Sequence, residues 1–178
     1  ESLHAIAGEW DALIPQEHHL RSDHLMVLEK SHINDIEFRY LFIYSGEHEH
    51  PVAAIYFQLL HFTSKHYEGP LLKNFLLRPA EQWLMKKGFR ILVCGNLFRI
   101  DAPGIYFDSR RTALSDILAT LQKYYASLER KPHVIMMKDW QSGWDTSWVK
   151  AQHYQLWPDD LTMKLSLRPG WKYYRDYE

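Results

Sequence analysis

The spacing of hydrophobic residues changes along the chain, from a helical period near the start to extended apolar runs further on. Apolar residues at helical spacing predict helices at 4–13 and at about 23–31, the second with Asp23 as its N-terminal cap. Two aromatic and β-branched runs, 38–44 and 52–60, predict strands. The polar segment between these runs predicts a turn, so we expect an antiparallel hairpin.

The rest of the chain alternates helical and extended patterns. The clearest pattern is an apolar stripe over about 110–128, which predicts a long helix with Asp108 or Ser109 as its cap. The other expected elements are helices at 71–87 (started anew or kinked at Pro79) and 146–152, and extended segments at 90–94, 104–107, 133–137, 154–157 and 161–167.

This order of elements predicts the fold class. A hairpin followed by alternating strands and helices is typical of a mixed central sheet flanked by helices on both faces, an α/β fold. A chain of 178 residues suits one domain of this kind. We expect the domain to span 1–168, and we expect 169–178 to begin a further segment.

Several short stretches carry a resemblance to a known family. They are Trp10-Asp11-Ala12-Leu13, Leu25 with Leu28-Glu29, Arg39-Tyr40-Leu41, Pro51-Val52-Ala53-Ala54 with Gln58, Leu92-Val93-Cys94-Gly95-Asn96, and the closing segment 148–167. With the order of elements, they resemble the amino-terminal half of bacterial acyltransferases of the acyl-CoA N-acyltransferase (GNAT) fold, described as BioF2-like and related to the FemAB peptidyltransferases. In the closing segment His153 and Tyr154 stand where the family commonly has Gly-Phe.

The resemblance implies a function. Such proteins transfer an acyl or aminoacyl group from acetyl-CoA, another acyl-CoA or an aminoacyl-tRNA to an amine on a small-molecule acceptor. Relatives usually carry two such domains, which implies that 169–178 leads into a second GNAT-like domain. The family's phosphate-binding Arg/Gln-x-x-Gly-x-Gly/Ala loop is missing from 63–70. This departure leaves an alternative open, a non-catalytic half that binds the acceptor or packs against a partner domain or a second copy.

Candidate donor-binding residues lie in three places. Lys65, His66 and Gly69 lie in the expected phosphate loop, Gly95 and Asn96 follow a strand, and Arg99 and Arg110 bracket the next loop and the long helix. Cations and turn glycines suit an anionic donor. The competing interpretation for each is an ordinary solvated loop or a charged helix cap.

Two side chains are candidates for proton transfer. Tyr124, expected to be exposed on the long helix, could protonate a departing thiolate, whereas Tyr125 belongs to the apolar face. Glu29 could act as a base for the acceptor amine. Cys94 could be a nucleophile only with a lowered pKa, and a small buried side chain is the alternative. For Tyr124 and Glu29 the alternative is a helix surface.

Composition removes other classes of function. The formal net charge is −1, with 21 Lys and Arg against 22 Asp and Glu, so no general basic field would attract nucleic acid. One cysteine excludes an internal disulfide. No apolar run approaches the roughly 18 residues of a membrane span, and no signal peptide is evident, so we expect a cytoplasmic protein.

Two further clusters have weaker interpretations. His48 and His50 alternate on the hairpin turn, and His18 and His19 are adjacent, but neither pair has an evident third metal ligand, so we expect no metal site. The tryptophans at 140, 144 and 148 could form a contact surface, which leaves an unrelated α/β interaction module as a third class.

Overall fold

A computed structural model of the chain describes residues 2–31, 33, 35–46, 50–63, 86–141, 143–151 and 154–155. The chain divides into two units, Glu1–Trp144 and Asp145–Glu178, and each is considered by itself. The described part of the second unit contains helix α5 (Ser147–Ala151), whose start is held by Asp145, which accepts a hydrogen bond from the Ser147 backbone N–H. The expected boundary at 168 lies outside the described residues.

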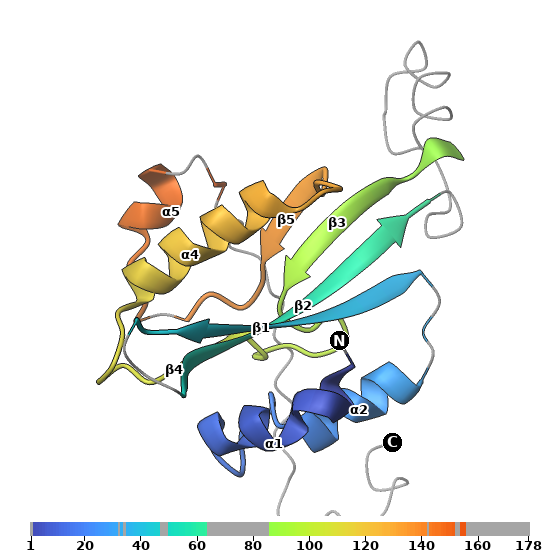
Figure 1. Ribbon diagram of the computed structural model, residues 1–178. Helices are drawn as coiled ribbons and strands as arrows, with labels where there is room; N and C mark the ends of the chain where they lie inside the picture. The colour runs from blue at the N-terminus through green and yellow to red at the C-terminus, as the bar shows by residue number, and fades with distance from the viewer. Residues whose placement is uncertain are drawn as a thin grey trace, which may run out of the picture. The chain divides into compact units, whose positions relative to one another are not determined.

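The first unit is built on a mixed sheet (Figure 1). Its strands are β1 (Ile36–Tyr44), β2 (Pro51–Phe62), β3 (Phe89–Cys94), β4 (Ile105–Phe107) and β5 (Val134–Met137). The strand order is β1-β2-β3-β5, with β4 also paired to β2. The β1–β2, β2–β3 and β2–β4 pairs are antiparallel, and β3 and β5 are parallel. The expected mixed sheet flanked by helices is therefore confirmed.

Strand β2 lies at the centre of this sheet. All residues from Pro51 to Leu59 are buried. One edge of β2 pairs with β1, and the other pairs first with β4, at 53–55, and then with β3, at 57–62. Because helices cover both faces, the strand is apolar except for Gln58 and His61, and it does not alternate regularly with polar residues.

Helices cover the two faces of the sheet (Figure 1). Helices α1 (Leu3–Leu13) and α2 (Ser22–Lys30) pack with Ala54 and Tyr56 of β2 in one buried cluster. Helix α4 (Leu114–Ser127) covers the other face. There the Phe57 ring lies 5.6 Å from the Tyr124 ring and 6.2 Å from the Tyr125 ring, measured between centroids. The expectation that Tyr125 belongs to the core is correct.

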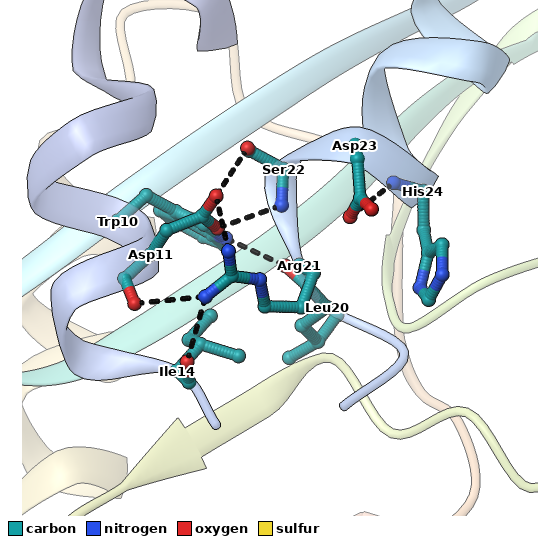
Figure 2. Close-up of polar contacts among 8 residues, drawn as sticks. All are labelled: Trp10, Asp11, Ile14, Leu20, Arg21, Ser22, Asp23 and His24. Atoms are coloured by element: carbon teal, nitrogen blue, oxygen red, sulfur yellow. Dashed lines mark hydrogen bonds and ion pairs between the residues drawn. The ribbon is translucent and has the colours of Figure 1, made fainter. Parts of the chain in front are cut away.

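The junction of α1 and α2 is held by polar contacts (Figure 2). The Trp10 indole N–H donates to the Leu20 carbonyl at 2.6 Å, which satisfies both groups in the core. The Asp11 carboxylate accepts from the Ser22 backbone N–H at 2.9 Å and from the Ser22 hydroxyl at 2.7 Å, and it pairs with Arg21 at 3.1 Å. A carboxylate on one helix therefore caps the start of the next helix.

Two expected helix caps are wrong. The residue that precedes α2 is Arg21, and Asp23 lies in the first turn, where its carboxylate accepts from the His24 N–H. Helix α4 begins at Leu114 because the backbone makes a separate turn at Asp108, whose carbonyl accepts from the Arg111 and Thr112 N–H groups. The start of α2 is capped by Asp11 of another helix, and the residue that precedes α4 is Ala113, which makes no side-chain cap hydrogen bond.

The remaining expected elements can be compared only in part. The expected helix at 71–87 lies outside the described residues except for Lys86 and Lys87, which are helical. The strand expected at 154–157 is wrong at its two described residues, because Tyr154 and Gln155 are not in a strand. The Tyr154 N–H instead donates to the Val149 carbonyl in α5. The segment 161–167 lies outside the described residues.

Replacing Asp11 by Ala should lower the free energy of unfolding by about 1–2 kcal/mol, because the variant loses the cap of α2 and the Arg21 ion pair. The matched control is Asp23→Ala, which removes an acid from the same helix start but only a bond to the adjacent residue. Urea denaturation followed by circular dichroism measures both. Equal losses for the two variants would contradict the assigned role of Asp11.

Candidate functional site

The most distinctive feature of the molecule is a loop between two strands, β3 and β4, that pair with the same edge of β2. The strand-end loop (residues 95–104) leaves the sheet after β3 and returns at β4, and both strands pair with the same edge of β2. Its two ends meet at Tyr56, where the Gly95 N–H donates to the Tyr56 carbonyl at 3.3 Å and the Tyr56 N–H donates to the Gly104 carbonyl at 2.8 Å. A surface loop whose ends meet in this way is an Ω-loop.

Glycines allow the two ends of this loop to meet. A Cβ at Gly104 would lie 2.4 Å from the Gly95 nitrogen and 2.6 Å from the Tyr56 oxygen, too close for any other residue. Gly95 has φ of +133°, which other side chains rarely adopt, and a Cβ there would meet Lys138 at 2.9 Å. The closure of the strand-end loop therefore depends on glycine at both ends.

A buried glutamine of β2 holds the loop from inside. The Leu97 N–H donates to the Gln58 side-chain oxygen at 2.8 Å. The Gln58 side-chain N–H donates in turn to the Tyr56 hydroxyl at 2.7 Å. Gln58 is fully buried, so these bonds satisfy an amide that would otherwise be costly to bury.

A lysine and an aspartate that follow β5 hold the loop from a second side. The Asp139 carboxylate accepts from the Ala102 N–H and from the Lys138 ammonium, both at 2.9 Å. The ammonium also donates to the Arg99 carbonyl at 2.8 Å. The side chains of Asp139 and Lys138 are only 6% and 19% exposed, so the pair is shielded from solvent. Since β3 and β5 are parallel, their carboxyl ends meet at one edge, where α/β sheets commonly bind ligands.

Strained backbone is concentrated at this edge. Among the described residues, the non-glycine residues with positive φ are Asp35, Asp101 and Asp139. Asp101 (φ 54°) lies in the strand-end loop, and Asp139 (φ 56°) holds the loop through Ala102. This conformation costs a residue other than glycine about 1–2 kcal/mol, less for Asp, and such strain recurs at functional sites.

Two histidines from the α1–α2 connection hold the loop from a third side. The His19 Nε2–H donates to the Pro103 carbonyl at 2.9 Å, and the His18 and His19 rings stack with centroids 4.3 Å apart. Burial is the main reason that the pKa values of both histidines are lowered. For His18, the neighbouring His19 lowers the pKa further, to about 4. Both rings are therefore neutral at pH 7.

The outer part of the loop presents apolar side chains. Phe98 and Ile100 are 54% and 53% exposed, although the backbone beside them is held firmly. The Phe98 N–H is bound by the Asn96 side-chain oxygen at 2.8 Å. The loop therefore presents the exposed Phe98 and Ile100 side chains on a backbone that is held by hydrogen bonds. The shielded charges beside it, Lys138 and Asp139, pair with each other.

The structure brings some predicted donor-site residues together. Gly95, Asn96 and Arg99 all lie in the strand-end loop. Arg110 lies in the turn before α4, exposed and paired with Asp108 at 3.0 Å, and this pairing raises its pKa. The candidates Lys65, His66 and Gly69, like His48, lie outside the described residues.

The predicted proton-transfer residues do not share a site. Tyr124 packs on Phe57, on the face covered by α4, and is half-buried, so the expected exposure is wrong. Glu29 belongs to α2 on the opposite face. There Tyr40 has a raised pKa, chiefly through burial and secondarily through the Glu29 charge. Because the sheet separates the two faces, Tyr124 and Glu29 cannot act on one substrate group together.

The thiol of Cys94 is a poor candidate for a nucleophile. The side chain is buried, and burial raises the pKa of the thiol, so the thiolate is scarce at pH 7. The interpretation of Cys94 as a small buried residue before a turn is the one that agrees with the structure.

Sequence reasoning missed the side chains that hold the loop. Lys138 and Asp139 directly follow a predicted strand, and such strand-end polar residues were a usable signal. The role of Gln58 could not be predicted, because a single amide in an apolar run does not indicate which distant group it will bind. The His18–His19 pair was considered only as a metal ligand. In the part of the chain that the structure describes, no group of three or more metal-ligating side chains occurs.

Comparisons with known proteins do not identify the chain. It matches no family model, and the searches of curated proteins and of solved structures give no match. Among the helices that are described, none is both long and apolar enough to cross a membrane. The site must therefore be interpreted from its own geometry.

The variant Gly104→Ala should be destabilised by about 2 kcal/mol or more, because its methyl group would collide with two backbone atoms that cannot move independently. Gly46→Ala is the matched control, since a Cβ there meets nothing within 4 Å. Urea denaturation measures both, and hydrogen exchange at Leu97 and Ala102 reports on the loop. A stable Gly104→Ala variant with protected loop amides would contradict the closure described.

The variant Asp139→Ala should lose about 3 kcal/mol of stability, because it leaves a shielded ammonium unpaired and places Ala at positive φ. Asp139→Asn should lose only about 1–2 kcal/mol, since Asn tolerates this backbone conformation and its oxygen can still accept from Ala102. Thermal and urea denaturation distinguish the two. Equal losses would show that the charge alone matters and would contradict the backbone argument.

Proposed function

We propose that this chain is a domain of an N-acyltransferase that transfers an acyl group from an acyl-CoA to an amine, with Tyr124 as the general acid. The observation that carries the proposal is a row of side chains across the sheet. Arg39 of β1 pairs in register with Phe57 of β2, and Phe57 pairs with Cys94, the last residue of β3. The Tyr124 ring stacks on Phe57, so it lies over β2 at the position that is in register with the end of β3.

The polar surroundings of Tyr124 suit this role. Its hydroxyl is hydrogen-bonded to the Arg39 guanidinium, a contact that raises the pKa of Arg39 after the larger effect of Glu37. A cation beside a phenol stabilises the negative charge that the phenol gains when it gives up its proton. The half-buried position limits competition from water without isolating the hydroxyl.

The connection between the parallel strands supports the place of the donor. In the resembling family, backbone N–H groups in a loop between a strand and a helix bind the donor phosphates. Among the described residues, the connection between the parallel strands β3 and β5 runs through the strand-end loop, β4 and then α4. In this proposal the donor phosphates lie near Arg99 and Arg110, which precede α4, and Gly95 and Asn96 line the approach.

The reaction needs no covalent intermediate on the protein. The acceptor amine attacks the thioester carbonyl, a C–N bond forms and the C–S bond breaks. The departing thiolate takes the Tyr124 proton, and the amine loses its proton to solvent or to a base. Direct attack agrees with the buried Cys94 thiol, which is not available to carry the acyl group.

A second function is favoured by the exposed loop residues. Phe98 and Ile100 form an apolar tip on a loop whose buried charges are already paired. This arrangement suits a non-catalytic domain that binds an acceptor or a partner domain without binding the acyl donor.

Isothermal titration with acetyl-CoA and with free CoA separates the two functions. The acyltransferase proposal expects saturable micromolar binding, weakened at least tenfold in Arg99→Ala. It further expects Tyr124→Phe to bind normally but to release thiol about 10²-fold more slowly in a panel of primary amines. Tyr44→Phe is the matched control, because that exposed hydroxyl bonds Glu9 away from the site.

The outcomes of this experiment are distinct. Failure to bind CoA up to millimolar concentrations would overturn the donor site and leave the acceptor-binding domain. Binding with no thiol release by any amine would overturn the catalytic role of Tyr124 but retain a donor-binding domain.

A further inference from the structure

Arg90 is the centre of a basic cluster at the amino ends of β3 and β5. On one side it pairs in register with His61 of β2, so the two side chains lie on the same face, about 5 Å apart at their bases. On the other side, its backbone N–H donates to Nδ1 of His133 at 3.0 Å, and its carbonyl accepts from the His133 N–H at 2.9 Å. Arg90 is half-buried and has an exposed histidine on each side.

Local contacts hold the three side chains in place. The Arg90 guanidinium donates through Nη2 to the Lys131 carbonyl, which fixes its position and uses one of its five N–H groups. The His61 ring lies against Gly88, since a Cβ on this glycine would be 2.6 Å from His61 Nε2. Because Nδ1 of His133 accepts a hydrogen bond, Nε2 carries the proton of that ring and is a donor.

The guanidinium of Arg90 differs from that of the other arginine in the described strands. Arg39 of β1 is paired with Glu37 at 2.8 Å. Within the described part of the chain, Arg90 pairs with no carboxylate, and its partner is a neutral carbonyl. A half-buried charge is stabilised by an anion that takes the place of lost water. The surroundings of Arg90 therefore suit an anionic ligand.

Other cations surround the cluster. Four exposed cations precede the two strands: Lys86 and Lys87 before β3, and Arg130 and Lys131 before β5. Since β3 and β5 are parallel, these residues lie at the same end of the sheet (Figure 1). The neighbouring carboxylates are Glu129 and Asp35, whose carbonyl accepts from the His61 N–H at 2.9 Å. With Arg90, five cations stand against two carboxylates, although the whole chain has a net charge of −1.

Helix stabilisation explains only part of this patch. Arg130 and Lys131 follow α4, and a helix carboxyl end attracts positive charge. Arg90 and His61 belong to strands, so their placement side by side has no such reason. Arg90 is also the part of the patch that is anchored and half-buried.

The cluster is separate from the proposed donor site. Arg90 and Cys94, the last residue of β3, are four positions apart, or about 13 Å along the strand. The strand-end loop, with Arg99, follows Cys94 at the other end of the strand. A ligand bound at Arg90 would therefore leave the proposed donor site unoccupied.

We propose that Arg90, His61 and His133 bind a phosphate group of a small phosphorylated ligand. The planar guanidinium can bind two phosphate oxygens, and each imidazole can add one N–H. The tetrahedral phosphate has oxygens for donors that approach from several sides, whereas a carboxylate has two in one plane. The patch is too small and the chain too weakly charged for a nucleic-acid strand, which contacts many phosphates. The site stands independently of the proposed acyl transfer.

Titration of the full chain with inorganic phosphate, at constant ionic strength and followed by ¹H–¹⁵N NMR, tests the site. We expect saturable shifts of the Arg90 Nε–H and the His133 imidazole, while the amides of Leu97 and Ala102 in the strand-end loop stay unchanged. Parallel titrations with pyrophosphate and O-phosphoserine distinguish a free phosphate from a phosphate ester as the preferred ligand. Acetate is the control anion and should bind at least tenfold more weakly.

Variants separate a specific site from general attraction. Arg90→Gln should weaken phosphate binding at least tenfold, because an amide has neither the charge nor the fork of donors. His133→Asn should weaken it about threefold, since its oxygen can still accept from the Arg90 N–H but the Nε2 donor is lost. Lys30→Gln, which removes an exposed cation at the end of α2, is the matched control and should bind as the wild type does. Circular dichroism checks that each variant is folded.

Each outcome decides the proposal. Absence of saturation up to tens of millimolar phosphate would overturn it, as would equal affinity for acetate. Equal weakening in Lys86→Gln and Arg90→Gln would show a general positive field and would also overturn it. So would an oligonucleotide that binds far more tightly than pyrophosphate. Weaker binding in both Arg90→Gln and His133→Asn, with Lys30→Gln unchanged, would establish the site, and His133→Asn decides alone if Arg90→Gln does not fold.

Discussion

The fold depends on a single strand that is buried on both faces and hydrogen-bonded along both edges. Strand β2 pairs with β1 on one side and with β3 and β4 on the other, and helices cover it above and below. Its buried backbone groups must all find partners, since an unpaired one would cost about 1–3 kcal/mol. This requirement explains why the chain returns to β2 after the strand-end loop, at β4, and does not leave that edge bare.

Tyr56 of β2 links the strand-end loop to the core through its backbone, its hydroxyl and its ring. Its backbone closes the strand-end loop by bonds to Gly95 and Gly104, and its hydroxyl accepts from Gln58, which holds the loop interior. Its ring packs in the cluster beneath α1 and α2. The base of the loop is therefore tied to the core by hydrogen bonds, while Phe98 and Ile100 remain exposed at its tip. Rigid presentation of an exposed surface reduces the entropy lost on binding.

The charged and titratable groups at this edge are used chiefly to hold the structure. Lys138 and Asp139 pair with each other and bind the loop backbone, and the two histidines are held neutral by burial. Tyr124 differs from them, because it lies on the face covered by α4, stacked on Phe57 of β2, where its contacts include Arg39 and the Tyr125 ring. For this reason the proposed chemistry is assigned to the α4 face.

The sequence by itself determined the local elements. The hairpin, the strands near 90–94 and 133–137 and the helix within 110–128 followed from hydrophobic period, because each pattern depends on neighbours in the chain. Gly95 and Asn96 were also recognised as strand-end residues, and Arg99 as a residue of the loop that follows. Tertiary structure decided the rest. Asp11 caps a helix other than its own, Glu29 and Tyr124 lie on opposite faces, and Gln58 meets Leu97 across 39 positions of sequence. Such contacts depend on strand register and on how faces are covered, and both are fixed only when distant segments pack together.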